Sequence, residues 1–422
     1  MKKITVYADF DFLTSPEEIG TLGYEHVRGK DHFVFEYSHK WLKQYGGILL
    51  SGDLMNVPSL QHPRSKDNVF GFVKDSFPDR WGRLLLDRRE RLTAQSEGRP
   101  IRMLTNYDYL TGIEDFTRMG GIRYKEEDNN DYIHASSKYS VPPIESLRTL
   151  CDACHEIESA EERNELPEQR WLDQLIDPGT SLGGARPKAN VIDTDGKLYV
   201  AKFPSKNDLE NTELIEHFSH QLAARAGINV AKTRTIKISK DRDLLLSERF
   251  DRTNTGQRIH FASALSLLGL DDGAGSSTGN GYLDIVEFIL RACTDVRLNL
   301  RELYRRIAFN VMFGNTDDHF RNHGFLLTPK GWTLSPAYDM NPGSKSHQCL
   351  LIDSYTEQSD IKALLAASES YMLERQEATE IIDEVRSAIK DWRKTAIALQ
   401  ISPKLLESYS LRWDNITTKE NE

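Results

Sequence analysis

The stretch GNTDDHFRNHGFLLTPKGWTLSPAYDM, Gly314–Met340, contains three oxygen-bearing side chains in an order that decides the expected fold. Asp317 and Asn322 form a D-x-x-x-x-N pattern, and Asp339 follows after an apolar run, a Lys-Gly turn and the residues Ser-Pro-Ala-Tyr. The apolar segments flanking the turn predict an antiparallel hairpin, which would return Asp339 to the loop that carries the other two. In the catalytic half of a kinase, groups in this order accept the proton of the attacking hydroxyl and hold magnesium ions. The stretch therefore predicts a phosphotransfer site.

A well-capped turn is the simpler explanation of the same loop, since Asn and Asp side chains often satisfy their own backbone. A six-residue pattern is a weak signal by itself. The predicted strands at 325–327 and 332–334, joined by a turn at 329–331, add further ordered elements to it. We therefore favour the phosphotransfer site over the capped turn.

Residues upstream of this stretch predict a nucleotide-binding region. Gly183 and Gly184 allow the backbone to approach a ligand closely, and Lys188 adds positive charge. A predicted strand over 198–203 carries Lys202 among apolar residues, where an ammonium group is costly unless an anion such as phosphate neutralises it. The alternative is an edge strand that leaves the ammonium group of Lys202 in solvent.

A predicted helix over 210–226 and a hairpin of strands at 233–238 and 244–250 follow the lysine strand. In a kinase this helix provides an acid that positions the lysine, so Glu213 and Glu216 are the candidates. Either acid could instead be an ordinary surface charge. The second strand of the hairpin would lead into the hinge that contacts adenine. Together with the helical pattern further on, this order predicts a bilobal kinase.

Composition limits the classes of protein that fit. The 422 residues suggest two or three units, and 39% hydrophobic with 28% charged residues is ordinary for a globular protein. The formal charge of −10 does not suit a protein that binds the phosphate backbone of a nucleic acid without a basic partner. We expect a cytoplasmic protein, since no signal peptide or membrane span is evident and cysteines number only four. The haem-like pattern Cys151-x-x-Cys154-His155 lies in a helical segment, and we interpret it as coincidental.

The predicted fold class is α+β, with a small N-terminal α+β domain and a largely helical C-terminal lobe. Strand-like segments at 3–10, 20–24 and 32–37 indicate a small antiparallel sheet, and 107–123 reads as a helix ended by a Gly-Gly pair. The polar stretch 125–140 marks a boundary. The predicted domains are 1–140, 141–260 and 261–422.

Five motifs of the second half resemble the HipA family of bacterial toxin serine/threonine kinases. They are SLGGARPKA at 181–189, VAKFPS at 200–205, SERFDR at 247–252, GNTDDHFRNHGFLL at 314–327 and LSPAYDM at 334–340. In the N-terminal region, DSFPDRWGRLLLDRR at 75–89 and DYLTGIEDFTRMGGIRY at 108–124 are similar to the same family. The resemblance therefore covers nearly the whole chain.

The resemblance implies a role for each matching residue. Asp317 would be the catalytic base, Asn322 and Asp339 would hold Mg2+, and Lys202 would contact the phosphates of ATP. The ATP-binding residues would be Ser181, Gly183, Gly184, Lys188, Lys202, Glu248 and Phe250. Backbone around Glu248 and Phe250 would meet the adenine. Ser181 matches the position at which some members phosphorylate themselves and switch the kinase off.

The resemblance also implies partners. Family members pair with a small helix-turn-helix antitoxin of the HipB type, so that operator DNA would be reached only through the antitoxin. This fits the acidic balance of the chain. Known members phosphorylate translation components, notably aminoacyl-tRNA synthetases, which halts growth and is the basis of persistence.

Two other functions compete with a toxin kinase. One is a small-molecule phosphotransferase of the antibiotic-kinase type, which shares the Asp, Asn, Asp order but has no counterpart of residues 1–140. The other is a non-catalytic corepressor that only binds the antitoxin. The presence of Lys202, Asp317, Asn322 and Asp339 argues against a decayed site.

Overall fold

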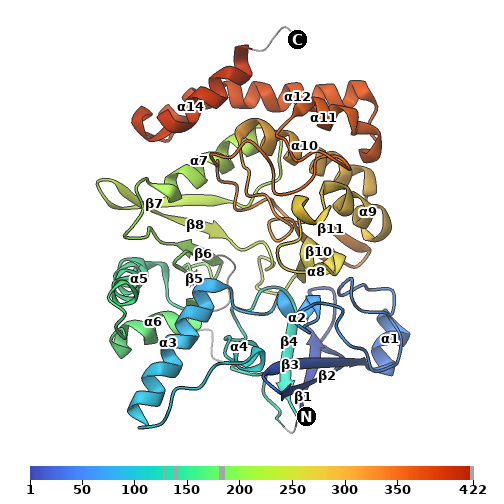
Figure 1. Ribbon diagram of the computed structural model, residues 1–422, viewed down its shortest axis with the longest axis vertical. Coiled ribbons are helices and arrows are strands. Elements are labelled where there is room, and N and C mark those ends of the chain that lie inside the picture. The colour runs from blue at the N-terminus through green and yellow to red at the C-terminus, as the bar shows by residue number, and fades with distance from the viewer. Residues whose placement is uncertain (128, 136–140, 180–185, 419–422) are drawn as a thin grey trace. The chain divides into compact units, whose positions relative to one another are not determined.

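The computed structural model describes residues 1–127, 129–135, 141–179 and 186–418 (Figure 1). The chain forms two compact units. The first comprises Met1–Leu209 and Thr235–Ala262, and the second comprises Glu210–Arg234 and Ser263–Glu422. This division differs from the three predicted domains, whose boundaries remain a prediction.

The first unit contains a four-stranded antiparallel sheet in the order β3-β2-β1-β4. Its strands are β1 (Lys2–Ala8), β2 (Glu17–Val27), β3 (Lys30–Tyr37) and β4 (Ile122–Glu126). Ile4, Val6 and Ala8 are fully buried while the residues between them are not, as a half-buried strand requires. Arg28 and Gly29, with φ of 54° and 77°, form the tight turn between β2 and β3. The predicted N-terminal strands are confirmed.

A second four-stranded sheet of the first unit has the order β5-β6-β8-β7. Its strands are β5 (Lys188–Ile192), β6 (Leu198–Lys202), β7 (Thr233–Ser239) and β8 (Arg242–Glu248). Helices α3 (Arg80–Ser96), α5 (Leu147–Glu162) and α6 (Gln169–Gly179) share one hydrophobic core with it. Core members include Trp81, Leu85, Leu150, Leu172, Val191 and Leu246. Cys151 and Cys154 of α5 are also buried there, which supports reading the haem-like pattern as coincidental.

The helix predicted over 107–123 is wrong for most of its length. Only α4 (Asn106–Thr111) forms, begun by a capping box between Thr105 and Asp108. After it, the Glu114 carboxylate accepts hydrogen bonds from two backbone N–H groups at 3.0 and 2.7 Å, which stabilises a turn instead of a helix. Helix α6 was not predicted. The remaining helices of this unit are α1 (His39–Tyr45) and α2 (Gly71–Lys74).

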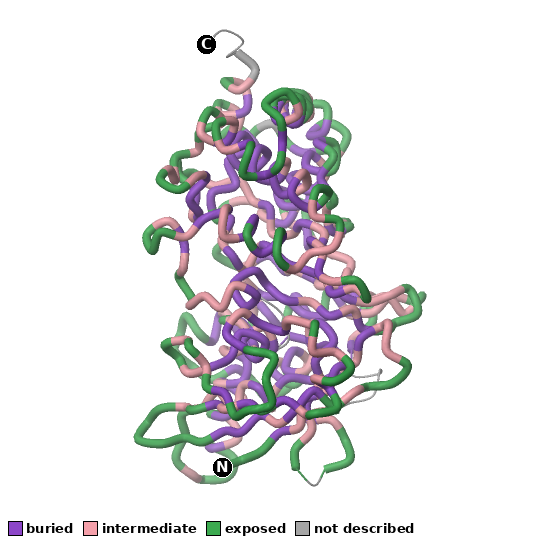
Figure 2. The backbone as a smooth tube through the Cα atoms, turned by 90° about the vertical axis from the view of Figure 1, so that its right-hand side faces the viewer, coloured by how far each residue is buried: buried purple, intermediate pink, exposed green. Residues whose placement is uncertain are grey.

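The second unit is largely helical, as predicted. Its helices are α7 (Thr212–Arg225), α8 (Ala264–Leu268), α9 (Tyr282–Ala292), α10 (Val296–Phe313), α11 (Ile361–Ala366), α12 (Arg375–Lys390), α13 (Trp392–Ala398) and α14 (Pro403–Thr418). Strand β9 (Phe261–Ser263) lies where the chain enters this unit, and β10 (Gly324–Thr328) and β11 (Gly331–Leu334) form a hairpin. Figure 2 shows buried positions along the inner segments and exposed ones at the outer turns. The predicted α+β fold class is confirmed.

Helix α10 is the central element of the second unit. It packs against α9, α12 and α14, and its residues from Ile307 to Phe313 are all buried. Several arginines interrupt its apolar face. Within the described part of the chain, no helix combines the length and apolar character needed to cross a membrane.

Candidate active site

The C-terminus of α10 fixes the start of the loop that carries Asp317. Gly314 ends the helix with φ of 93°, a left-handed conformation that suits glycine, and its N–H donates to the Asn310 carbonyl at 2.9 Å. Trp413 of α14 donates from its indole to the Phe313 carbonyl at 2.9 Å and stacks on the Phe313 ring at 5.0 Å. The loop therefore leaves a rigid helix end.

Asp317 and Asn322 lie together in this loop, as the D-x-x-x-x-N pattern predicts. The Asn322 side-chain amide donates to the Asp317 carbonyl at 3.0 Å, and the His319 N–H donates to the same oxygen at 3.0 Å. The Asn322 N–H closes the turn on the His319 carbonyl at 2.8 Å. The Asp317 side chain is exposed. A carboxylate in this position is accessible to an incoming hydroxyl group.

The predicted hairpin is confirmed and returns Asp339 toward the loop. Strands β10 and β11 pair from Phe325↔Leu334 to Thr328↔Gly331. Beyond them, the Tyr338 hydroxyl donates to the Arg321 carbonyl at 2.6 Å, which ties the segment to the loop. Asp339 itself has φ of 57°, a left-handed conformation that is uncommon for a residue with a side chain. Strained backbone of this kind is often found at functional sites.

Helix α7 brings an acid to the same part of the second unit. Glu213 and Glu216, the two candidates for a positioning acid, are 1% and 4% exposed, so neither is an ordinary surface charge. A Glu216 carboxylate oxygen accepts a hydrogen bond of 3.5 Å from the amide of Asn341. Asn341 lies two positions after Asp339, and sequence reasoning had not singled it out.

The residues predicted to contact the phosphates lie in the first unit. Lys202 is half-buried at the end of β6, with Lys188 of β5 paired opposite it. The Lys188 ammonium group is buried and lies 3.1 Å from the Asp79 carboxylate. Burial raises the pKa of Asp79, although Lys188 opposes that shift. The structure thus gives Lys188 a buried ion pair, and its contact with ATP stays a prediction. Ser181, Gly183 and Gly184 lie outside the described residues.

The predicted hinge residues are positioned by strand β8. Glu248 pairs with Tyr199 of β6, and the Arg249 N–H donates to the Leu198 carbonyl at 2.9 Å. The half-buried Phe250 ring packs against Phe261 at a centroid distance of 6.0 Å. The adenine contact at this strand end remains a prediction.

The SERFDR motif also forms a buried ion network that sequence reasoning missed. Asp251 is fully buried and accepts hydrogen bonds from Arg249 at 2.6 Å, Arg252 at 2.7 Å and the backbone N–H of Gly120 at 2.8 Å. Burial alone would raise the pKa of Asp251, but the two guanidinium groups outweigh it and hold the pKa well below its usual range. These hydrogen bonds link the end of β8 to the FTRMGG turn, residues 116–121, of the N-terminal region.

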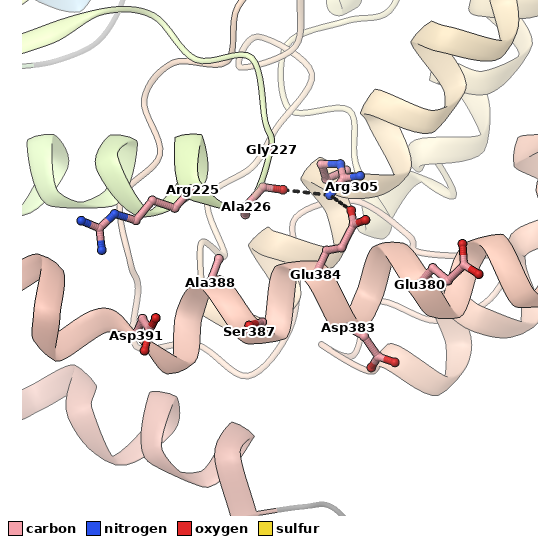
Figure 3. A pocket seen from close by; sticks show the side chains of 10 residues that line it. All are labelled: Arg225, Ala226, Gly227, Arg305, Glu380, Asp383, Glu384, Ser387, Ala388 and Asp391. Atoms are coloured by element: carbon pink, nitrogen blue, oxygen red, sulfur yellow. Dashed lines mark hydrogen bonds and ion pairs between the residues drawn. The ribbon is translucent and has the colours of Figure 1, made fainter.

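A groove of about 810 Å³ in the second unit lies apart from these residues (Figure 3). It lies between the end of α7, α10 and α12. Arg305 of α10 crosses it, donating to the Ala226 carbonyl at 2.9 Å and pairing with Glu384 at 2.6 Å. Along the axis of α10, Arg305 lies about 13 Å before Gly314, where the loop that carries Asp317 begins. None of the predicted site residues lines the groove, so we do not assign it to catalysis.

The fold class is that of a kinase-like protein, as predicted. A solved complex of Shewanella oneidensis HipA, HipB and operator DNA contains a chain with the same fold, at a TM-score of 0.63 and 16% identity. The match covers 98% of this chain and 95% of that chain. The family model of the HipA-like C-terminal domain matches residues 180–392, and that of the HipA N-terminal domain matches residues 11–106. The chain belongs to the HipA family.

Curated relatives of this chain are named as kinases. A putative kinase, Y4mE, of Sinorhizobium fredii is 28% identical over 332 residues, which cover 72% of this chain and 71% of that protein. The serine/threonine-protein kinase toxin HipA of Shewanella oneidensis is 28% identical over 199 residues, covering 40% of this chain and 45% of the relative.

Proposed function

We propose that this HipA-family kinase transfers the γ-phosphate of ATP to a serine or threonine hydroxyl of a protein, with Asp317 as the base. The observation that carries the proposal is the exposed Asp317 carboxylate beside Asn322, in a loop to which a hairpin returns Asp339. Phosphoryl transfer depends mainly on positioning and charge stabilisation, and this arrangement would supply both. Asp317 would orient the hydroxyl and accept its proton.

Mg2+ would be held by the Asn322 amide oxygen and the Asp339 carboxylate. Both are hard oxygen ligands of the kind that Mg2+ prefers, and Mg2+ is usually bound by one or two carboxylates together with substrate phosphates. Among the residues that the structure describes, no group of three or more His, Cys, Asp or Glu side chains is placed to hold a metal. When bound, the ion would neutralise charge on the transferred phosphate.

Three described residues are proposed to contact ATP. Lys202 would pair with its phosphates, and the backbone at Glu248 and Phe250 would meet the adenine. Ser181, Gly183 and Gly184 are further candidates for binding ATP, and Ser181 is the candidate for autophosphorylation.

We further propose a helix-turn-helix antitoxin of the HipB type as the partner of this chain. The solved relative is described with HipB and operator DNA, which supports this proposal at the level of fold. The formal charge of −10 suits a chain that reaches DNA only through a partner. A translation component in the cytoplasm, such as an aminoacyl-tRNA synthetase, is the proposed target, and its phosphorylation would halt growth.

Incubation with radiolabelled ATP and Mg2+, with and without a bacterial lysate, tests the proposal. Mass spectrometry would then identify labelled proteins. We expect label on a lysate protein with wild-type chain and with Asp383→Asn, an exposed aspartate of α12, but not with Asp317→Ala. Label on small molecules only would indicate a small-molecule phosphotransferase. Absence of label with wild-type chain would favour the corepressor.

A further inference from the structure

Two adjacent carboxylates in the candidate loop face different surroundings. Asp317 is exposed, whereas Asp318 is only 4% exposed. An ionised carboxylate is costly to bury unless hydrogen-bond donors or cations compensate it. The Asp318 side chain therefore needs partners inside the second unit.

A single oxygen of Asp318, Oδ2, accepts three hydrogen bonds. The donors are the Tyr282 hydroxyl at 2.7 Å, the Asn310 side-chain amide at 2.7 Å and Nε2 of His323 at 2.9 Å. Burial would raise the pKa of Asp318, but His323 and Tyr282 outweigh it and the pKa is lowered. Asp318 thus connects α9, α10 and the residue that follows Asn322.

The same network extends to the first residue of the loop. The Asn315 amide donates to Oδ1 of Asn310 at 3.1 Å, and Asn310 in turn donates to Asp318. The Tyr282 ring lies edge-on to His323 at 5.7 Å. The buried Asp318 carboxylate is therefore linked to both ends of the loop, to Asn315 through Asn310 and to His323 directly.

We propose that Asp318 is a positioning residue that holds Asp317 and Asn322 in their working geometry, an inference that rests on the proposed kinase function. Asp317 is the immediate chain neighbour of Asp318, and Asn322 is the immediate chain neighbour of His323. Both neighbours are held by the buried hydrogen bonds. A displacement of about 1 Å in a reacting group can lower a rate by about 100-fold. Loosening the anchor should therefore impair transfer more than it impairs nucleotide binding.

Tyr282→Phe is the mild test, because it removes one hydroxyl and keeps the buried ring. Tyr304→Phe is its matched control, since Tyr304 is also fully buried in the second unit and donates to the Leu364 carbonyl at 3.2 Å, away from the loop. We expect kcat to fall about tenfold or more in Tyr282→Phe, with KM for ATP within about twofold of wild type. We expect kcat to fall further in Asp318→Asn than in Tyr282→Phe. Equal kcat in the two tyrosine variants would overturn the positioning role.

A second readout does not depend on activity. Hydrogen–deuterium exchange of a peptide covering residues 314–323 reports on the backbone hydrogen bonds donated by His319 and Asn322. We expect faster exchange in Tyr282→Phe than in wild type or Tyr304→Phe. Unchanged exchange would overturn the positioning role even in an active enzyme. A wild-type chain without kinase activity but with this exchange pattern would overturn the proposed function and leave the anchoring role supported.

Discussion

The thiol sulfur of Cys349 lies 3.7 Å from Oδ1 of Asp317, and it donates a hydrogen bond to the Thr316 carbonyl at 3.2 Å. Burial raises the pKa of this half-buried thiol, and the Asp317 carboxylate raises it further, because both disfavour the thiolate. Cys349 is therefore a chemical reporter of the carboxylate proposed as the catalytic base.

Asp317→Asn should accelerate alkylation of Cys349 by iodoacetamide. Removing the neighbouring negative charge lowers the thiol pKa, and the thiolate is the reactive form, so we expect a rate increase of about threefold or more at mildly alkaline pH. Peptide mapping by mass spectrometry measures the rate. Cys151 and Cys154 are buried and serve as slow internal references, and Asp383→Asn should leave the rate unchanged. An unchanged rate in Asp317→Asn would contradict the observed proximity.

Asp317→Ala should abolish phosphoryl transfer without unfolding the protein. The side chain is exposed, so its loss removes no core packing. A general base and its orientation contribute about 10²–10⁴-fold to the rate. Labelled ATP measures the transfer and a thermal melt checks the fold. Full activity in the variant would rule out Asp317 as the base.

Asp339→Gly should separate the proposed metal role from backbone strain. Glycine adopts the left-handed φ of 57° without penalty, while alanine costs about 1–2 kcal/mol there. We therefore expect Asp339→Gly to melt at or above the temperature of Asp339→Ala. Both variants should lose magnesium-dependent binding of ATP, measured by calorimetry. Wild-type affinity in either variant would argue against the metal role.

Asp251→Asn should destabilise the first unit by about 3–5 kcal/mol, because Arg249 and Arg252 would then be buried without their counter-charge. Denaturant unfolding measures the loss, and the exposed Asp195→Asn should change little.

The same carboxylate predicts a pH dependence. Its pKa is lowered in the folded state, so the stabilisation is complete above the unfolded value of about 4 and decreases as the pH falls below it. The wild-type protein should therefore lose stability on acidification more steeply than Asp251→Asn. If the stability of the two proteins decreased equally with falling pH, that result would contradict the buried, ionised state of Asp251.

The features that sequence predicted well are local. The hairpin after Asp317 follows from turn residues and apolar runs within one short stretch, and the Asp317–Asn322 contact joins positions five apart in the chain. The features that it missed join distant segments. Asp251 contacts Gly120 across 131 positions and Lys188 contacts Asp79 across 109. No periodic pattern encodes such pairs, because each partner alone looks like a surface charge or a turn. Asp318 had a local signal, the second acid of Thr-Asp-Asp-His, but its burial depends on α9 and α10.

Gly120→Ala should destabilise the protein more than Gly29→Ala, although both glycines have left-handed backbones, with φ of 71° and 77°. A methyl group at Gly29 would meet nothing within 4 Å, so only the conformational cost of about 1 kcal/mol applies. At Gly120 it would lie 2.9 Å from the backbone nitrogen of Phe261, and we expect about 2–4 kcal/mol in total. Denaturant unfolding of both variants measures the difference. A loss no larger than that of Gly29→Ala would show that Gly120 does not lie against the Phe261 backbone in solution.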